Sequence, residues 1–532
     1  MFALRFDTFM IASQTSDCFD TTIIGSGFGG SILAMILRRA GQKVLLVEKC
    51  QHPKFAIGES STPLANLLLE EIAHDSNLPN LRNLTEWGRW QTHYPQLPCG
   101  LKRGFSFYQH EAGFPLKPSD RATQLLVAAS PNDHVADTHW YRPAFDEFLV
   151  KEAQSHGVDY QPDTTLKSLT RAPESWDLML QSLGSSHAVR TKFIVDASGP
   201  RGCLTRHFHI PHSQPADMPK TQTLFAHFTG VRRLEDCDHG FANPTPPYPV
   251  DDSAVHHLID GGWVWVLRFN NGVTSVGVVL EDNAANQIGL RELESGWQNL
   301  LKLYPSLQAS LGTAQRTTNW HYIAQVASRA ETLVGEGWAL LPSSVGFIDP
   351  MLSTGFALTL LGVRRLATIL TQTACGLPRQ DALQDYKTIT LLELDHTAEL
   401  IGALYANLKN LENFRDLTLL YFAAASYAET VRRLGHPEKA QSFLLASDPR
   451  FGPAARGICQ AAKLNPHRRV QAQVHGLIEA IDIAGLTNRG ANNWYPVRAD
   501  DLLNSATKVG ASRPEIRAML KLLNVDFDGL SG

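Results

Sequence analysis

Three glycines and an acidic residue form the clearest chemical pattern in the 532-residue chain. Gly25, Gly27 and Gly30 make a G-x-G-x-x-G motif, and Glu48 follows 23 residues after the first glycine. The first glycine allows a tight turn, the second lets the backbone approach a pyrophosphate, and the third packs a helix on a strand. Glu48 is then placed to hold a ribose hydroxyl pair. The pattern predicts a dinucleotide site; the alternative is a glycine-rich turn without a ligand.

A lysine stands within an apolar and small-residue segment, residues 99–107 (CGLKRGFSF). The alternation of Phe105 and Phe107 favours a strand with one buried side. Lys102 on such a strand is partly desolvated, which lowers its pKa and leaves a free amine. The alternative is a solvated surface charge beside Arg103, which is the usual situation of a lysine.

The residues Ser353, Thr354 and Gly355 follow Pro350 and precede a run with helical periodicity that extends to Thr371. The first N–H groups of a helix have no partner within the helix, and its dipole favours negative charge there. We therefore predict an anion site at the start of this helix. Asp349 stands immediately before Pro350. An aspartate at such a position is often only a turn residue.

Two tryptophans alternate in residues 263–269, so a strand would direct Trp263 and Trp265 to the same side. By themselves they are most simply explained as a pair of core aromatics. The 20 histidines include no H-E-x-x-H spacing, so no metal site is expected. His256 and His257 are adjacent, and on a strand their rings point in opposite directions.

The elements that position these residues can be read from periodicity and from capping residues. A strand (19–24), a helix (31–40, ending at Gly41) and a strand (43–47) surround the glycine motif as a βαβ unit. Thr62 and Pro63 suit the start of another helix. Further helices are expected at 142–156, 353–371, 391–411 and 416–434, and further strands at 193–195, 224–229, 256–259, 263–269 and 274–280.

Composition and charge exclude several classes of protein. Lys plus Arg number 48 and Asp plus Glu 52, a net charge of −4 that gives no basic footprint for nucleic acid. The seven cysteines contain no C-x-x-C, so neither a disulfide framework nor structural zinc is expected, and a cytoplasmic location fits. No apolar run near the N-terminus is long enough to span a membrane, and no membrane association is expected. Residues 1–17 lack the layout of a signal peptide and are expected to form a loose arm.

Four segments together resemble one family, the FADH2-dependent halogenases of the flavin monooxygenase superfamily, and most closely those acting on phenols. The segments are Gly58-Glu59-Ser60, residues 99–107, Trp263-Val264-Trp265 and residues 347–355 (FIDPMLSTG). The likeness covers roughly residues 19–380. It implies an α/β fold: a Rossmann-like FAD-binding domain of the monooxygenase type, an interleaved β-sheet substrate domain and a helical C-terminal region.

The corresponding division of the chain is as follows. Residues 18–200 form the first FAD-binding part, with an inserted segment at about 75–140. Residues 201–335 form a sheet-rich substrate part, residues 336–380 return to the FAD-binding part with the flavin and halide site, and residues 381–532 form the helical region.

The resemblance also implies a reaction. Reduced FAD and O2 give a flavin hydroperoxide, a halide (chloride or bromide) is oxidised to hypohalous acid, and Lys102 delivers the halogen to an electron-rich ring. A flavin reductase would act in trans, because no second dinucleotide motif is present. The substrate would be a small aromatic molecule, free or bound to a carrier protein.

The resemblance implies roles for individual residues within the matching motifs. Thr354 and Gly355 would bind the halide, although the same amides could instead contact only the flavin oxygen. Trp263, Trp265 and Glu59 would separate flavin from substrate, but Glu59 could also act only electrostatically at a helix start. The expected cofactor-binding residues are Gly25, Gly27, Phe28, Gly30, Glu48, Arg142, Asp349 and Gly355.

Two departures from the family pattern leave alternatives open. Leu267-Arg268 replaces the Ile-Pro that follows the tryptophan pair, and a buried arginine needs a partner. This departure favours a flavin-dependent aromatic hydroxylase or a non-catalytic flavin-binding protein. Leu352 stands where the tryptophan enzymes carry a glutamate before Ser-Thr-Gly. A leucine cannot act as a base, so we expect a phenol, which activates its own ring; alternatively, another acid supplies the base.

Overall fold

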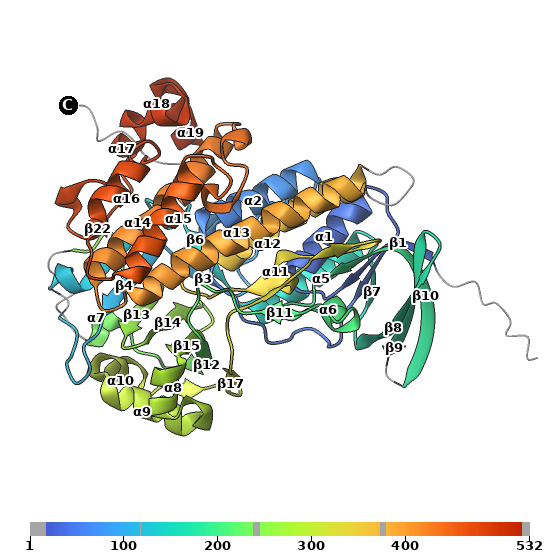
Figure 1. Ribbon diagram of the computed structural model, residues 1–532, viewed down its shortest axis with the longest axis horizontal. Helices are drawn as coiled ribbons and strands as arrows, with labels where there is room; N and C mark the ends of the chain where they lie inside the picture. The colour runs from blue at the N-terminus through green and yellow to red at the C-terminus, as the bar shows by residue number, and fades with distance from the viewer. Residues whose placement is uncertain (1–17, 118, 183, 238–244, 373–378, 524–532) are drawn as a thin grey trace, which may run out of the picture.

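The computed structural model describes residues 18–117, 119–182, 184–237, 245–372 and 379–523. The expected N-terminal arm, residues 1–17, lies outside these ranges. The chain builds two large sheets and a set of C-terminal helices (Figure 1).

The first sheet contains the glycine motif. Its strands run in the order β19 (Val334–Gly335), β20 (Trp338–Leu340), β10 (Ser185–Asp196), β1 (Cys18–Ile24), β2 (Val44–Val47) and β7 (Asp159–Gln161). β1 pairs in parallel with both β2 and β10. The strands at the parallel centre of this sheet are largely apolar, because helices cover them. These helices are α1 (Phe28–Arg39), α5 (Arg142–Ser155) and α12 (Thr354–Thr371).

The second sheet joins segments from distant parts of the chain. Its order is β16 (Gln315–Arg316), β12 (Thr221–Thr229), β15 (Thr274–Glu281), β14 (Gly262–Arg268), β13 (Ala254–Ile259), β4 (Gly104–Gln109), β5 (Gln124–Ala128) and β22 (Trp494–Tyr495), with β17 (His321–Ile323) beside β12. A separate two-stranded ribbon, β3 (Cys99–Lys102) and β6 (Asp137–Trp140), precedes and follows the β4–β5 hairpin.

The long helices α12 and α13 (Gln380–Ala406) cross the molecule between the two sheets in Figure 1. Helix α14 (Leu411–Arg433) packs on α2 (Pro63–Asp75). The remaining C-terminal helices are α15 (Phe451–Leu464), α16 (Gln471–Ile478), α17 (Ala499–Asn504), α18 (Ala506–Val509) and α19 (Arg513–Leu522). No helix in the described residues is long and apolar enough to cross a membrane.

The first sheet also includes β8 (Thr164–Ala172) and β9 (Ser175–Ser182), with β9 paired to β10. A small third sheet contains β11 (His212–Ser213), β18 (Ser328–Ala330) and β21 (Gly346–Phe347). The other α-helices are α3 (Pro79–Arg82), α4 (Trp87–His93), α6 (Cys203–His207), α7 (Leu234–Cys237), α8 (Asp282–Ile288), α9 (Glu294–Leu303), α10 (Pro305–Leu311) and α11 (Pro342–Val345).

Most of the expected elements are present, with corrections at the helix ends. The first helix starts at Phe28 rather than at residue 31, because the last glycines of the motif already adopt helical geometry. The helix expected over 391–411 ends at Ala406, and Asn410 caps a new helix by accepting from the N–H of Asn413. Asp416 therefore lies in the second turn of α14 and not in its first. The domain boundaries given above stay a prediction.

Candidate active site

The glycine motif forms a tight turn between β1 and α1. Gly25 has φ +106°, and a Cβ atom at Gly30 would lie 2.0 Å from the carbonyl oxygen of Gly25. Both positions therefore require glycine. Gly27 caps α1 without a side-chain hydrogen bond, and the nearest atom to a Cβ placed there is Arg142 Nη2 at 3.6 Å. The N-terminus of α1 thus keeps uncapped amides and room beside a guanidinium.

Glu48 directly follows β2 next to this turn and is buried. Its Oε2 accepts hydrogen bonds from the backbone N–H of Ser26 (3.0 Å) and from the Ser26 hydroxyl (3.1 Å), and Lys54 forms an ion pair with it. Burial works to raise the pKa of Glu48, but Lys54 and the Ser26 bonds hold that pKa below its usual value. Glu48 is therefore a fixed carboxylate beside the turn.

Arg142, the first residue of α5, is held in one orientation. It pairs with Asp146 through two hydrogen bonds of 2.8 and 2.7 Å, and its Nη1 donates to the carbonyls of Ile57 and Gly58. Its guanidinium also lies over the Phe28 ring, 5.1 Å from the centroid. A cation is thus fixed at the start of α1.

The starts of two helices meet here. Phe28, in the first turn of α1, contacts Phe356, in the first turn of α12, with ring centroids 4.9 Å apart. Trp140 stacks on Phe356 at 4.2 Å. Ser353 caps α12 with φ +53° and makes no side-chain capping bond, and a Cβ at Gly355 would meet no atom within 4 Å. The first turn of α12 therefore also presents free amides to open space.

Asp349 lies just before this second helix start and is fully buried. Its Oδ2 accepts from the hydroxyl of Tyr405 (2.8 Å), which in turn accepts from the indole N–H of Trp263 (3.1 Å). Burial raises the pKa of Asp349 to about 7. The resulting chain connects the α12 start to the second sheet.

These features fit an extended dinucleotide with a ring system at its far end. The uncapped amides of α1 and the Arg142 cation suit a pyrophosphate, Glu48 suits a ribose, and the first turn of α12 suits an anion or a ring oxygen. The predicted cofactor residues are thus distributed over β2 and the starts of α1, α5 and α12, and Phe28 and Arg142 join these groups by direct contact.

Trp263 and Trp265 share one face of β14, as their alternation predicts, with ring centroids 5.9 Å apart. Trp263 lies 5.1 Å from the His256 ring, which stacks on Phe107 at 4.4 Å. Phe107 is followed by Phe105 at 6.4 Å. An aromatic layer therefore lies between Asp349 and Phe105.

Glu59 is buried before α2, where Thr62 and not Glu59 caps the helix. Glu59 Oε1 lies 2.7 Å from Nε2 of His227, which comes from β12 of the second sheet, while Oε2 has no hydrogen-bond partner. No local motif indicates His227, which lies 168 residues from Glu59. The pair connects residues 57–62 to the second sheet.

Lys102 ends β3 with no exposed surface, so the solvated alternative is wrong. Its Nζ donates to the carbonyl oxygen of Ser61 (2.5 Å) and lies 3.9 Å from the centroid of the Phe105 ring. Burial lowers the pKa of Lys102 well below that of a free lysine. The amine is thus available as a neutral group near neutral pH.

Asp137 stands directly opposite Lys102 in the β3–β6 ribbon, and sequence reasoning missed it. Its Oδ1 accepts from the side-chain amide of Asn66 (2.9 Å), and its Oδ2 is buried without a partner. Burial raises the pKa of Asp137. No local motif indicates this residue, because its position depends on the pairing of strands 35 residues apart.

A cavity of about 390 Å³ lies beside this pair. Its lining includes Asn66, Phe105 and Asp137, together with Tyr421 and Phe422 of α14. Residues between 483 and 523 of the C-terminal region also line it. The lining of this cavity contains no residue from 201–335, the segment expected to form the substrate part.

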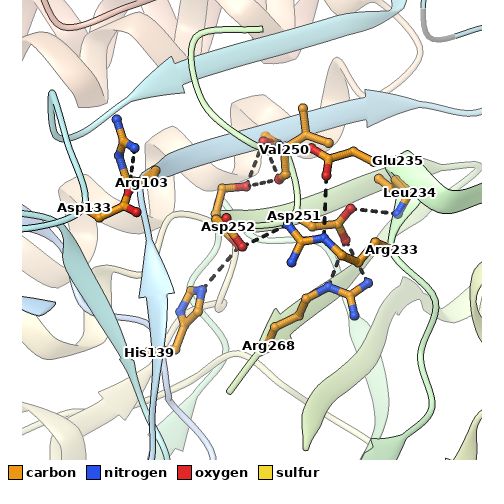
Figure 2. Close-up of polar contacts among 12 residues, drawn as sticks. Arg103, Asp133, His139, Arg233, Leu234, Glu235, Val250, Asp251, Asp252 and Arg268 are labelled. Carbon is orange, nitrogen blue, oxygen red and sulfur yellow. Dashed lines mark hydrogen bonds and ion pairs between the residues drawn. The ribbon is translucent and has the colours of Figure 1, made fainter. Parts of the chain in front are cut away.

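Arg268, at the end of β14, is partly buried, and its charge is paired with a carboxylate. Its Nε donates to Asp251 (2.9 Å), and its Nη atoms donate to the carbonyls of Val231 and Arg232 (each 2.8 Å). Figure 2 shows Arg268 and Asp251 within a polar network that also contains Arg233 and Asp252. The backbone of Arg268 contacts β3, because a Cβ at Gly100 would lie 1.9 Å from its carbonyl oxygen.

Within the described part of the chain, no group of three or more His, Cys, Asp or Glu side chains is arranged to hold a metal ion. The site is therefore built from helix N-termini, an aromatic layer and a buried lysine next to a cavity.

Comparison with known proteins connects this arrangement to one family. The family model described as tryptophan halogenase matches residues 134–416. Among curated proteins, the monodechloroaminopyrrolnitrin halogenase of Pseudomonas fluorescens is 27% identical over 67% of this chain, and the tetracycline 7-halogenase of Kitasatospora aureofaciens is 27% identical over 64%. The chain spans only 62% and 61% of the lengths of these two relatives.

A third relative, a brominase of pyrrole-2-carbonyl on a peptidyl carrier protein from Pseudoalteromonas luteoviolacea, is 24% identical over 67% of this chain and 78% of its own length. Among solved structures, halogenase PltM in complex with phloroglucinol and FAD matches with a TM-score of 0.78 and 23% identity, covering 90% of this chain and 99% of that one. This likeness shows the fold, and the predicted fold class is confirmed. Because the family model spans more than half of the chain, the protein belongs to the tryptophan halogenase family.

Proposed function

We propose that this protein is an FADH2- and O2-dependent halogenase of an electron-rich, phenolic aromatic substrate. The observation that carries the proposal is Lys102, a fully buried lysine whose neighbour Phe105 lines a cavity, in a chain of the halogenase family. A buried amine is costly to keep without a function, since its charged form loses hydration.

Reduced FAD, when bound, supplies the oxidising equivalents that convert a halide to hypohalous acid with O2. The residues that would hold it are those at the starts of α1, α5 and α12, together with Glu48 and Asp349. The amides of Thr354 and Gly355 would hold the halide, since a helix start with uncapped N–H groups attracts anions.

Lys102 would receive hypohalous acid, either by a hydrogen bond or as a haloamine. The lowered pKa supports both versions, because a neutral amine is a hydrogen-bond acceptor and a nucleophile, whereas an ammonium is neither. The aromatic layer around Trp263 and Phe107 would keep the cofactor apart from the cavity and would exclude water from the space between them.

Leu352 supports a phenol as substrate. It is fully buried and apolar, so the position before Ser-Thr-Gly offers no base. A ring without an electron-donating substituent would need such a base. Phloroglucinol, the phenol bound to PltM, activates its ring through its oxygens. We therefore expect halogenation ortho or para to a hydroxyl group and poor use of free tryptophan.

The departure at Leu267-Arg268 gives no separate support to a hydroxylase or to a non-catalytic flavin-binding protein. Arg268 is occupied by Asp251 and by two backbone carbonyls, and it does not line the cavity.

The proposed partners are a flavin reductase acting in trans and either a free or a carrier-bound substrate. A relative that acts on a carrier-bound pyrrole makes the second form worth testing. NADPH mixed with the purified single protein and FAD should leave the flavin oxidised. Rapid reduction in that mixture, followed by absorbance, would contradict the need for a reductase.

The test of the function is a competition assay. The protein, a flavin reductase, NADH, FAD and bromide are incubated with equal amounts of tryptophan and resorcinol, and products are identified by mass spectrometry. We expect bromoresorcinol. Bromotryptophan as the main product would refute the phenol assignment, a hydroxylated product without bromine would favour a hydroxylase, and no product from any of a panel of phenols would refute the enzyme assignment.

A further inference from the structure

We propose that Asp137 is the base that removes the ring proton during halogen transfer, acting on the same carbon atom that receives halogen from Lys102. The proposal rests on the proposed function and names the acid that takes the place of the glutamate absent at Leu352.

The first argument is the position of the two side chains. Lys102 and Asp137 are directly opposed across the antiparallel β3–β6 ribbon, so their side chains project from the same face. Halogen arrives at one ring carbon and a proton leaves from that carbon, so the donor and the base must lie within a few ångström of each other. An opposed pair on two strands meets this requirement.

The second argument is the unused acceptor. Asn66 binds Oδ1 of Asp137 and thereby fixes the carboxyl group, while Oδ2 is buried with no hydrogen-bond partner. Asp137 lines the cavity together with Asn66 and Phe105. A buried carboxylate oxygen without a donor costs free energy unless a ligand uses it.

The third argument concerns the charged groups around the carboxyl group. Lys102 faces it from β3, and Glu429 and Arg433 face it from α14. Lys102 forms no ion pair with Asp137, because its Nζ donates to Ser61 instead. Burial raises the pKa of the acid and lowers that of the amine, so a proton moves between them at little cost.

The step balances without a further reactant. The substrate ArH and hypohalous acid HOX give ArX and water: the carbon–halogen bond forms, and the halogen–oxygen and carbon–hydrogen bonds break. The neutral amine of Lys102 takes the halogen from hypohalous acid and releases water, so a nitrogen–halogen bond replaces a nitrogen–hydrogen bond. As the halogen passes from this nitrogen to the ring carbon, the carboxylate of Asp137 takes the ring proton and returns it to the nitrogen, which restores the amine and the carboxylate.

The experiment uses Asp137→Asn, which keeps the size and the hydrogen bonding of the side chain but removes the base. Resorcinol and ring-deuterated resorcinol are brominated under reductase-supplied FADH2, and hypohalous acid is measured separately with a chemical trap. We expect unchanged hypohalous acid formation, a loss of bromination of about 10²–10⁴-fold, and a ring-deuterium isotope effect that the wild-type protein lacks. A merely structural role would not produce the isotope effect.

Two further variants complete the test. Asp137→Ala should regain bromination in proportion to added formate, which supplies a small base. Glu429→Gln removes another acid that lines the cavity and should show no isotope effect. FAD binding by an Asp137 variant demonstrates that this variant is folded. One folded variant of the two is enough to test the role of Asp137.

The outcomes separate the two proposals. If the wild-type protein brominates resorcinol and Asp137→Asn does so at a similar rate without an isotope effect, the role of Asp137 is refuted and the function stands. The same holds if formate has no effect on a folded Asp137→Ala. If the wild-type protein forms no halogenated product, the proposed function itself fails.

Discussion

We expect the lysine at the end of β3 to perform its proposed role through desolvation. Lys102→Met replaces the amine with an apolar side chain of similar length, so the packing against Phe105 is kept. We expect halogenated product to fall by at least about 10²-fold, since the group that directs the halogen is gone, while hypohalous acid formation continues. Mass spectrometry of the product and a chemical trap for hypohalous acid measure the two steps. Product formation at the wild-type level would exclude Lys102 from the reaction.

We expect the second glycine of the turn to be required for cofactor binding and not for the fold. Gly27→Val adds a branched side chain where the nearest atom is Arg142 Nη2 at 3.6 Å, so the protein itself has room for the change. We expect FAD affinity to fall by at least about tenfold, because the new methyl groups occupy the pyrophosphate path. The thermal unfolding temperature of the apoprotein should change little.

Fluorescence titration with FAD measures this effect. Gly457→Val, in α15 where a Cβ meets no atom within 4 Å, is the matched control and should bind FAD as the wild-type protein does. Undiminished FAD affinity in a folded Gly27→Val protein would show that the cofactor lies elsewhere.

At the scale of elements, the short strand β3 depends on close backbone contact. Asn270 and Cys99 exchange hydrogen bonds at one end of the strand, and Gly100 lies against the carbonyl of Arg268. Gly100→Ala would place its Cβ 1.9 Å from that oxygen, so β3 or β14 must move. We expect a loss of about 1–3 kcal/mol in the free energy of unfolding, and slower halogenation because Lys102 moves with its strand.

Urea denaturation and product assays test this expectation. Gly476→Ala, in α16 with open space at its Cβ, should be as stable as the wild-type protein or slightly more stable. A Gly100→Ala protein with unchanged stability and unchanged activity would mean that β3 is not held in this way.

Elements close in sequence were predictable, whereas contacts between distant strands were not. The glycine motif, its helix and Glu48 follow from spacing within 24 residues, and the pairing of Trp263 with Trp265 follows from strand alternation. By contrast, Asp137 becomes a neighbour of Lys102 only through strand register, and His227 reaches Glu59 from another sheet. A single sequence carries no local signal for such pairs.

At the scale of the whole molecule, several buried histidines make stability depend on pH. His110 contacts His257 (Nε2 to Nδ1, 2.8 Å) on the second sheet, and burial lowers the pKa of His110 to about 3. In the unfolded chain its pKa is near 6.5, so below that pH the unfolded state binds a proton that the folded state does not. His110 therefore reduces stability progressively as the pH falls from 6.5 towards 3.

The variant His110→Asn isolates this contribution. The difference in unfolding free energy between the wild-type protein and the variant should shift in favour of the variant as the pH falls from 7 to 4, by at most about 1.4 kcal/mol per pH unit. Urea denaturation at several pH values measures it. A difference that is constant over this range would show that His110 binds protons equally in the folded and unfolded states.

The wall that α14 and the residues after it contribute to the cavity lies beyond residue 416, where the family match ends. Under the proposed function, the residues after 416 would contribute to ring selection, whereas the oxidant would be made by residues earlier in the chain. Substitutions after 416 could then admit a new aromatic scaffold without changing the flavin site, provided that Tyr421 and Phe422 still pack on Phe105. The same division gives protein engineers a place to recombine relatives without rebuilding the chemistry.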